Sequence, residues 1–167
     1  MSDTNTNKLS ASAREAIDRW LTRFPPDQKR SGVLQALHIV QEENKGYLTE
    51  ELMDAVADYL EIPRISVYEV ASFYTLYNLK PVGKHVINVC TNISCMLCDA
   101  EKMLHHFKKR LNIDLNETTA DGKFTLREVE CLAACVGAPA AQIGRKYYEN
   151  LTPEKIDHIL QELEGNK

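Results

Sequence analysis

The chain has 167 residues, and its formal net charge of −4 results from 20 basic and 24 acidic side chains. This length allows one medium-sized domain or two small ones. Neither half is basic enough to predict a nucleic-acid-binding surface. No apolar stretch approaches the roughly 20 residues that a membrane-spanning helix needs. We therefore expect a protein that binds no nucleic acid and does not insert directly into a membrane.

The N-terminal residues have neither the charged nor the apolar segment of a signal peptide, and we expect residues 1–10 to be a disordered N-terminus. The chain contains five cysteines, and an odd number without an export signal points to a reducing compartment. We therefore expect a cytoplasmic protein in which disulfides do not form.

Residues 11–80 contain no cysteine and show four helical patterns, in which apolar residues recur at three- and four-residue steps. Two possible capping boxes, Ser12–Glu15 and Ser66–Glu69, are expected to open the first and fourth helices. Pro25 and its neighbour should stop the first helix, and the third should end before Pro63. The sequence predicts a helical bundle lobe over this range.

Residues 81–167 alternate between strand and helix patterns. Two runs rich in β-branched residues, 84–90 and 123–129, are typical of strands. Between them, residues 98–111 have the apolar spacing of an amphipathic helix. A strand–helix–strand unit makes its two strands parallel and joins them by a right-handed crossover.

A hairpin and a last helix complete this half. Residues 140–143 and 146–149 flank a possible tight turn at Gly144, and Thr152-Pro153 has the pattern of a helix start. The resulting order, β-α-β-β-β-α, is that of a thioredoxin-like domain. We therefore predict an α/β fold class, with an N-terminal helical bundle followed by this domain.

Four cysteines form two closely spaced pairs. Cys90 and Cys95 make a C-x4-C pair, and Cys131 and Cys135 make a C-x3-C pair. Each pair follows a predicted strand, and parallel neighbours end at the same edge of a sheet, so the pairs should face each other. Four thiolates are the ligands that an iron–sulfur cluster needs. The pattern predicts an electron carrier.

The fifth cysteine, Cys98, allows other assignments of the ligands and of the function. With Cys98, the sequence also contains the plant-type ferredoxin spacing C-x4-C-x2-C…C. We favour Cys135 as the fourth ligand, because Cys98 falls where the next helix should start. A structural zinc site is the main rival. The C-x2-C spacing of Cys95 and Cys98 would also suit a thiol-redox protein, although Cys131 and Cys135 would then have no role.

At this level of detail the chain resembles the NuoE-type subunits of bacterial respiratory complex I (NADH:quinone oxidoreductase), a thioredoxin-like [2Fe–2S] ferredoxin family. The likeness covers nearly the whole chain from about Ser10. It includes both cysteine pairs and the segments Ala71–Tyr74, Pro81–His85, Thr118–Leu126, Gly137–Pro139 and Leu151–Glu154. Carried over by position, the ligands of one [2Fe–2S] cluster fall on Cys90, Cys95, Cys131 and Cys135.

The resemblance also implies a function and partners. The cluster would exchange single electrons with FMN on a neighbouring NADH-binding flavoprotein subunit (NuoF-type), and a larger iron–sulfur subunit of the peripheral arm would be a second partner. FMN and NADH would bind the partner, in keeping with the lack of a G-x-G-x-x-G or P-loop motif here. The chain would act within an enzyme, a translocase, without turnover by itself. It would lie on the cytoplasmic side of the inner membrane.

Two alternatives in function stay open. Similar subunits serve NAD-linked formate dehydrogenases and NAD-reducing hydrogenases, with the same cluster in a different complex. In a different class, the chain would be a thiol-redox protein or a scaffold stabilised by a metal.

The sequence departs from the family pattern at two loop positions. Ala133 stands within the C-x3-C loop and Cys98-Asp99 just beyond the first pair, where relatives commonly have glycine. If position 133 needs a positive φ, alanine adds strain that glycine would not. Both changes bear on loop geometry and thus on the reduction potential. Glu128 and Glu130 are expected to lower that potential if they lie close to the cluster.

Overall fold

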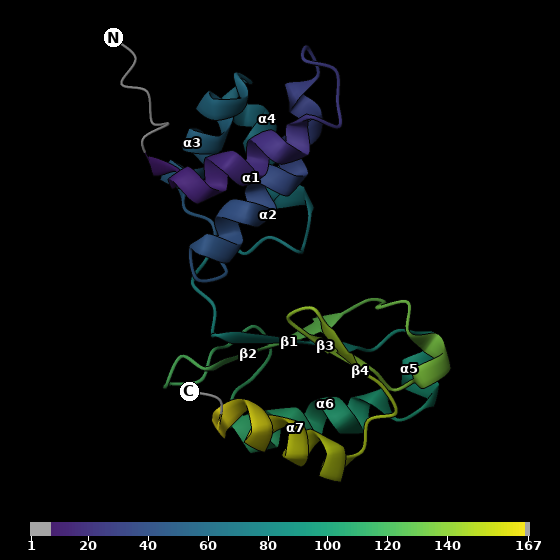
Figure 1. The fold of residues 1–167 in the computed structure, drawn as a ribbon. Helices are drawn as coiled ribbons and strands as arrows, with labels where there is room; N and C mark the ends of the chain where they lie inside the picture. The colour runs from purple at the N-terminus through teal and green to yellow at the C-terminus, as the bar shows by residue number, and fades with distance from the viewer. Residues whose placement is uncertain (1–7, 166–167) are drawn as a thin grey trace. The chain divides into compact units, whose positions relative to one another are not determined.

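The computed structural model describes residues 8–165, in two compact units with their boundary in the chain between Pro81 and Val82 (Figure 1). Residues 1–7 of the expected disordered N-terminus lie outside the described residues. Leu9 is buried in the core of the first unit, so the residues just before the first helix belong to the fold. None of the helices within residues 8–165 has the length and apolar character that crossing a membrane requires.

The first unit is helical, as predicted. A short 3-10 helix, η2 (Lys29–Gly32), precedes the second of its α-helices. The core is formed by apolar side chains from every α-helix, among them Ile17, Leu37, Val56 and Val67, all of them fully buried. The α-helices are α1 (Ala11–Leu21), α2 (Val33–Glu43), α3 (Glu50–Leu60) and α4 (Arg64–Phe73).

Both predicted capping boxes are wrong. Ser10, not Ser12, is the N-cap of α1, and its Oγ accepts a hydrogen bond from the backbone N–H of Ala13 at 2.9 Å. Helix α4 begins at Arg64, so Ser66 is a buried residue inside the helix. The motif alone could not place these starts, because α1 offers two serines two residues apart and α4 begins after Pro63 without any side-chain cap.

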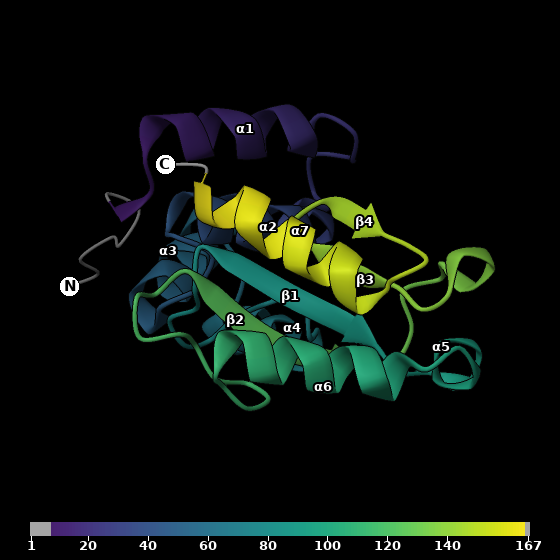
Figure 2. The ribbon, with the colours of Figure 1, turned by 90° about the horizontal axis from the view of Figure 1, so that it is seen from below.

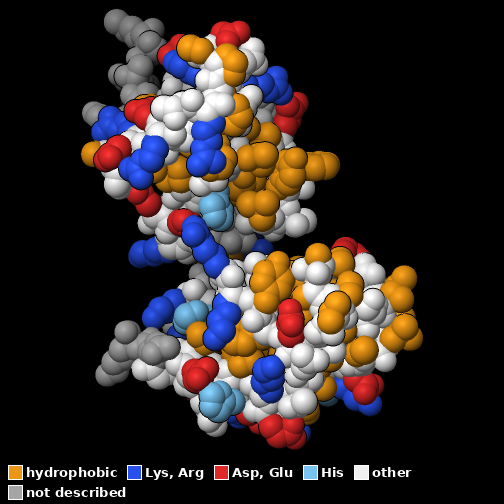
Figure 3. Space-filling model, turned by 45° about the vertical axis from the view of Figure 1, so that its right-hand side comes forward, with side chains coloured by type: hydrophobic (Ala, Val, Ile, Leu, Met, Phe, Trp, Pro, Cys, Tyr) orange, Lys and Arg blue, Asp and Glu red, His pale blue; other side chains and the backbone are white. Residues whose placement is uncertain are grey.

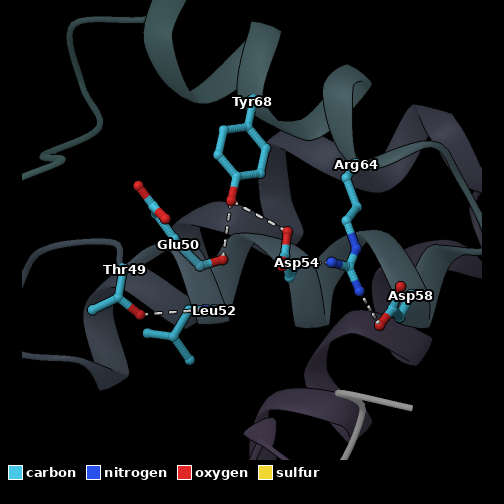
Figure 4. A network of polar contacts seen from close by, with 7 residues as sticks. All are labelled: Thr49, Glu50, Leu52, Asp54, Asp58, Arg64 and Tyr68. Carbon is cyan, nitrogen blue, oxygen red and sulfur yellow. Dashed lines mark hydrogen bonds and ion pairs between the residues drawn. The ribbon is translucent and has the colours of Figure 1, made fainter. Parts of the chain in front are cut away.

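Polar contacts tie the start of α4 to α3 (Figure 4). The Arg64 guanidinium lies 2.9 Å from a carboxylate oxygen of Asp54 and 3.5 Å from one of Asp58. The Tyr68 hydroxyl donates to the other oxygen of Asp54 at 3.2 Å. Asp54 therefore receives two partners from α4, which has no side-chain N-cap of its own.

The second unit is built on a sheet with the strand order β2-β1-β3-β4. Strand β1 pairs parallel with β2, in a register that places Cys90 opposite Val129, which confirms the predicted parallel pairing. Strand β3 is antiparallel to β1 and to β4. The strands are β1 (His85–Cys90), β2 (Phe124–Val129), β3 (Ala141–Ile143) and β4 (Lys146–Tyr148).

Two helices cover one face of this sheet. Figures 1 and 2 both show α6 (Ala100–Leu111) and α7 (Pro153–Gly165) on the same side of the strands. The core between them contains Ile87 and Leu126 from the strands and Phe107 and Ile156 from the helices, each fully buried. As predicted, Pro153 opens the last helix; Thr152 Oγ1 accepts from the backbone N–H of Lys155 at 3.2 Å.

The crossover differs from the prediction, because the expected helix over 98–111 is preceded by a separate short helix. Helix α5 (Ile93–Leu97) carries Cys95, and Asp99 has a φ of 65° between α5 and α6. Ala133, in the second cysteine loop, has a φ of 56°. Asp99 and Ala133, both at loop positions where we expected relatives to carry glycine, therefore lie in the left-handed region, which side chains other than glycine adopt at a cost.

Helices α6 and α7 are joined on their surface by Asp157. One of its carboxylate oxygens lies 2.9 Å from His106 Nε2 and accepts a hydrogen bond from Arg110 Nε at 2.7 Å. The hydrogen bond with His106, together with the charge of Arg110, lowers the pKa of Asp157 below its ordinary value. The ionised carboxylate is thus the form that the fold favours.

We expect Ala133→Gly to stabilise the metal-free chain by about 1 kcal/mol, because glycine adopts the left-handed conformation without steric cost. Urea denaturation measures this difference. Ala134→Gly is the matched control: Ala134 has a φ of −105°, so glycine there should be neutral or destabilising. Equal effects at both positions would contradict the prediction.

Asp157→Asn should destabilise the fold at neutral pH, because the carboxylate bound to His106 and Arg110 is lost. Since its folded pKa lies below the roughly 3.9 of an unpaired aspartate, the contribution is present above that value and is lost as the pH falls. Denaturation should show a difference from wild type that persists at about pH 5 and above and shrinks below about pH 4. Glu164→Gln, on the same helix, is the control, and a difference that grows in acid would contradict this assignment.

Candidate metal centre

The parallel pairing delivers both cysteine pairs to one end of the sheet. Cys90 is the last residue of β1, and Cys131 follows the end of β2 by two positions. The ladder continues one step beyond β1, where the backbone N–H of Thr91 donates to the carbonyl of Val129 at 3.2 Å. In Figures 1 and 2, α5 and the loop after β2 both lie at the end toward which β1 points. The two loops thus meet where the sequence predicted.

The first pair is buried. Cys90 and Cys95 are 3% and 2% exposed, and they pack with Ala100 and Ala140. Asn92 is the N-cap of α5, where its side-chain oxygen accepts from the N–H of Ile93 at 2.7 Å. The C-x4-C loop is therefore folded as a capped helical turn that turns Cys95 inward.

The second pair is exposed. Cys131 and Cys135 lie on the surface, and Cys135 opens the 3-10 helix η3 (Cys135–Gly137). The left-handed conformation of Ala133 accompanies a hydrogen bond from its backbone N–H to Cys131 Sγ, at 3.3 Å. This donor is directed at a sulfur, where it would stabilise negative charge on a thiolate.

The electrostatics of Cys95 involve thiols of both pairs. Burial, followed by a hydrogen bond with the Cys90 side chain, raises the pKa of Cys95 to about 11, and Cys135 adds to this rise. The backbone of Ala140 acts in the opposite direction through a hydrogen bond. The pKa of Cys95 therefore responds to one thiol of its own loop and to one of the second loop.

The Cys90 thiol has a further contact with the second loop. Its Sγ donates to the backbone carbonyl of Glu130, with 3.7 Å between sulfur and oxygen. This contact depends on the thiol proton, which a metal ion displaces when it binds the sulfur as thiolate. In the metal-free chain, the proton therefore serves as a cross-link between the loops.

Within residues 8–165, no group of three or more His, Cys, Asp or Glu side chains is arranged to hold a metal ion. Cys95 is hydrogen-bonded to Cys90 and is influenced electrostatically by Cys135, whereas Cys131 contacts the backbone of its own loop. The donor set still fits an iron–sulfur cluster by its chemistry, because four thiols from two loops lie at one sheet end. The N–H of Ala133 also points at one of these sulfurs.

Cys98 lies apart from the buried pair. It is exposed and forms the C-cap of α5, where its backbone N–H donates to the carbonyl of Cys95 at 3.0 Å. It thus ends a helix that the sequence did not predict, instead of starting the predicted one.

One contact at this end was not predicted. Thr91 Oγ1 donates to a carboxylate oxygen of Glu128 at 2.6 Å. Both residues adjoin the cysteine loops in sequence, but nothing in their spacing pairs them. Only the register of β1 against β2 brings them within reach of each other.

Comparisons with known proteins identify the family of the chain. The family model described as "Thioredoxin-like [2Fe-2S] ferredoxin" matches residues 17–164. The E subunit of NADH-quinone oxidoreductase from Rickettsia bellii is 45% identical over 146 residues, which are 87% of each chain. An E subunit of NADH-quinone oxidoreductase from Rhizobium meliloti is 43% identical over 148 residues, covering 89% of this chain and 86% of the relative.

A solved structure shares the fold. A chain in the crystal structure of an NAD+-reducing [NiFe]-hydrogenase in the H2-reduced state superposes with a TM-score of 0.70. The match has 20% sequence identity and covers 81% of this chain but 22% of the longer hydrogenase chain. At this identity the likeness concerns the fold. Because the family model spans most of its length and the two bacterial relatives match it along most of theirs, the chain belongs to the thioredoxin-like [2Fe–2S] ferredoxin family, among the E subunits of NADH-quinone oxidoreductases.

Proposed function

We propose that this chain is the electron-transfer subunit of an NADH:quinone oxidoreductase, with one [2Fe–2S] cluster bound by Cys90, Cys95, Cys131 and Cys135. The observation that carries the proposal is the meeting of two cysteine loops at one end of a parallel strand pair, in a chain of this family. When bound, the cluster supplies one-electron chemistry. It would exchange electrons with FMN on a neighbouring NADH-binding subunit.

The chain's own residues would hold the cluster and tune its potential. Cys90 and Cys95 offer buried sulfurs, which limits the access of water on that side. The N–H of Ala133, directed at Cys131 Sγ, favours negative charge there and should raise the potential. The carboxylates of Glu128 and Glu130 oppose this effect, and their exposure to solvent weakens it.

Exposed apolar side chains on both cysteine loops support docking to a partner protein. On α5, the side chains of Ile93, Met96 and Leu97 are 67%, 55% and 77% exposed. On η3, directly after Cys135, the side chain of Val136 is fully exposed. Figure 3 shows hydrophobic side chains on the surface of this unit among polar and charged ones. We call these four residues the apolar collar. Apolar groups gathered on a surface mark interaction sites, and a partner seated there would exclude water around the cluster.

We assign the collar to the NADH-binding flavoprotein subunit (NuoF-type), because electron exchange requires the two redox centres to be close. A larger iron–sulfur subunit of the peripheral arm would be the second neighbour. This assembly would place the chain on the cytoplasmic side of the inner membrane. The names of the curated relatives, subunits of an NADH-quinone oxidoreductase, support this complex over a formate dehydrogenase or a hydrogenase.

The structure argues against a thiol-redox function. A nucleophilic cysteine needs a lowered pKa and access to solvent. Cys95, the first residue of the C-x2-C spacing, is buried, and its pKa is raised to about 11. At neutral pH its thiol would stay protonated and unreactive.

The wild-type chain, purified anaerobically with cluster assembly, should be brown and contain two irons and two sulfides per chain, as the formula [2Fe–2S] states. Reduction with dithionite should bleach it and give a spin-one-half electron paramagnetic resonance signal. We expect Cys135→Ser to alter this signal or lose the cluster and Cys98→Ser to leave it unchanged. A colourless protein, or one containing zinc, would contradict the proposal. An altered signal in Cys98→Ser with an unchanged signal in Cys135→Ser would make Cys98 the fourth ligand.

Leu97→Glu and Val136→Glu should each weaken binding to the flavoprotein subunit about tenfold, because each places a charge in an apolar contact. Titration calorimetry with the purified flavoprotein measures the affinity, and the visible spectrum checks that the cluster is retained. Tyr147→Glu is the control, since Tyr147 is 47% exposed on β4 and belongs to neither cysteine loop. Unchanged affinity in both collar variants would place the interface elsewhere.

A further inference from the structure

We propose that Thr91 and Glu128 form a tether between the two cysteine loops, which slows the loss of the cluster and holds a carboxylate charge beside it. This inference rests on the proposed function, since it concerns how the cluster is kept. Neither residue is proposed as a ligand. Both are positioning residues, which act through the loops that carry the cysteines.

The tether spans the point where the two chain segments diverge. Thr91 follows Cys90 directly, and Glu128 is the second-last residue of β2, three positions before Cys131. Thr91 Oγ1 donates to Glu128 Oε1 at 2.6 Å, a short distance typical of a hydrogen bond to a charged acceptor. Beyond this point, the first segment enters α5 and the second enters the C-x3-C loop.

Backbone pairing ends at the same place. The Thr91 N–H donates to Val129 at 3.2 Å, after the last residue pair of the parallel ladder, Cys90 with Val129. In the register, Glu128 is opposite Val89, so Glu128 and Thr91 are diagonal neighbours on one face of the sheet. The Thr91–Glu128 hydrogen bond therefore links the two strands on one face of the sheet, where their backbone pairing ends.

The tether contributes a larger share of the links between the two loops once metal is bound. In the metal-free chain, the Cys90 thiol also reaches the second segment by donating to the Glu130 carbonyl. A metal-bound thiolate has no proton to donate, so that contact is lost on loading. The Thr91–Glu128 bond uses no sulfur and can persist in the loaded protein. It then remains as a side-chain link between segments that must keep their spacing for the cluster to stay bound.

The same bond fixes a charge. Glu128 is exposed, and a free glutamate on a surface would sample many rotamers. The Thr91 hydroxyl holds its carboxylate at the cluster end of the sheet. A fixed negative charge there opposes the addition of an electron, so it should lower the reduction potential.

Four variants of the full chain with its cluster assembled test the tether, with two measurements on each. The first is the rate at which an iron chelator bleaches the visible spectrum, and the second is the midpoint potential. Thr91→Val should lose iron about five- to tenfold faster than wild type, because the hydroxyl donor is gone. Thr91→Ser keeps the donor and should behave like wild type. Glu128→Gln keeps an acceptor without the charge, so its iron loss should be intermediate and its potential higher.

Thr119→Val is the matched control for general destabilisation. Thr119 Oγ1 donates to Asp121 at 2.5 Å in the loop before β2, at the opposite end of that strand from the cysteines. This variant should lose iron at the wild-type rate. Iron loss from Thr91→Val at the wild-type rate, or equally fast loss from Thr119→Val, would overturn the tether while the cluster and the proposed function stand. A wild-type chain that assembles no cluster would overturn the proposed function and the tether with it.

Discussion

The parallel pairing of β1 with β2 is the constraint on which the rest of the second unit depends. It aligns six residues of each strand, from His85 opposite Phe124 to Cys90 opposite Val129. Because side chains alternate between the faces of a strand, a slip by one residue would turn Ile87 and Leu126 out of the core. The core thereby sets the register, and the register sets where the cysteine loops begin. Placement of the site is thus a consequence of hydrophobic burial some distance from it.

The candidate site combines a buried half and an accessible half. The first loop is a capped helical turn whose two cysteines are buried, whereas the second presents both of its cysteines at the surface. This asymmetry suits a redox centre that is anchored on one side and approached by a partner on the other. Apolar residues exposed on both loops are in keeping with such an approach.

Two non-glycine residues near the cysteines adopt the left-handed conformation: Asp99, between α5 and α6, and Ala133, in the C-x3-C loop. A conformation of this kind costs free energy, and its persistence requires surroundings that impose it. At Ala133 the backbone N–H meets the sulfur of Cys131. The strained residue therefore donates a hydrogen bond that would stabilise negative charge on Cys131, a candidate ligand. At Asp99 the strain coincides with the break between α5 and α6, which lets Cys95 face inward while α6 lies against the sheet.

The sequence by itself determined the parallel strands, the covering helices, the α/β fold class and the family, because these follow from local patterns: β-branched runs, apolar spacing and the cysteine pairs. It did not place the starts of α1 and α4: α1 is capped by Ser10 and not by Ser12, and α4 begins directly after Pro63 without a side-chain cap. Tertiary structure alone decided the short helix around Cys95, the burial of one cysteine pair and the contact between Thr91 and Glu128. The burial and the Thr91–Glu128 contact depend on which residues of distant segments are brought face to face, which the pairing of β1 with β2 decides.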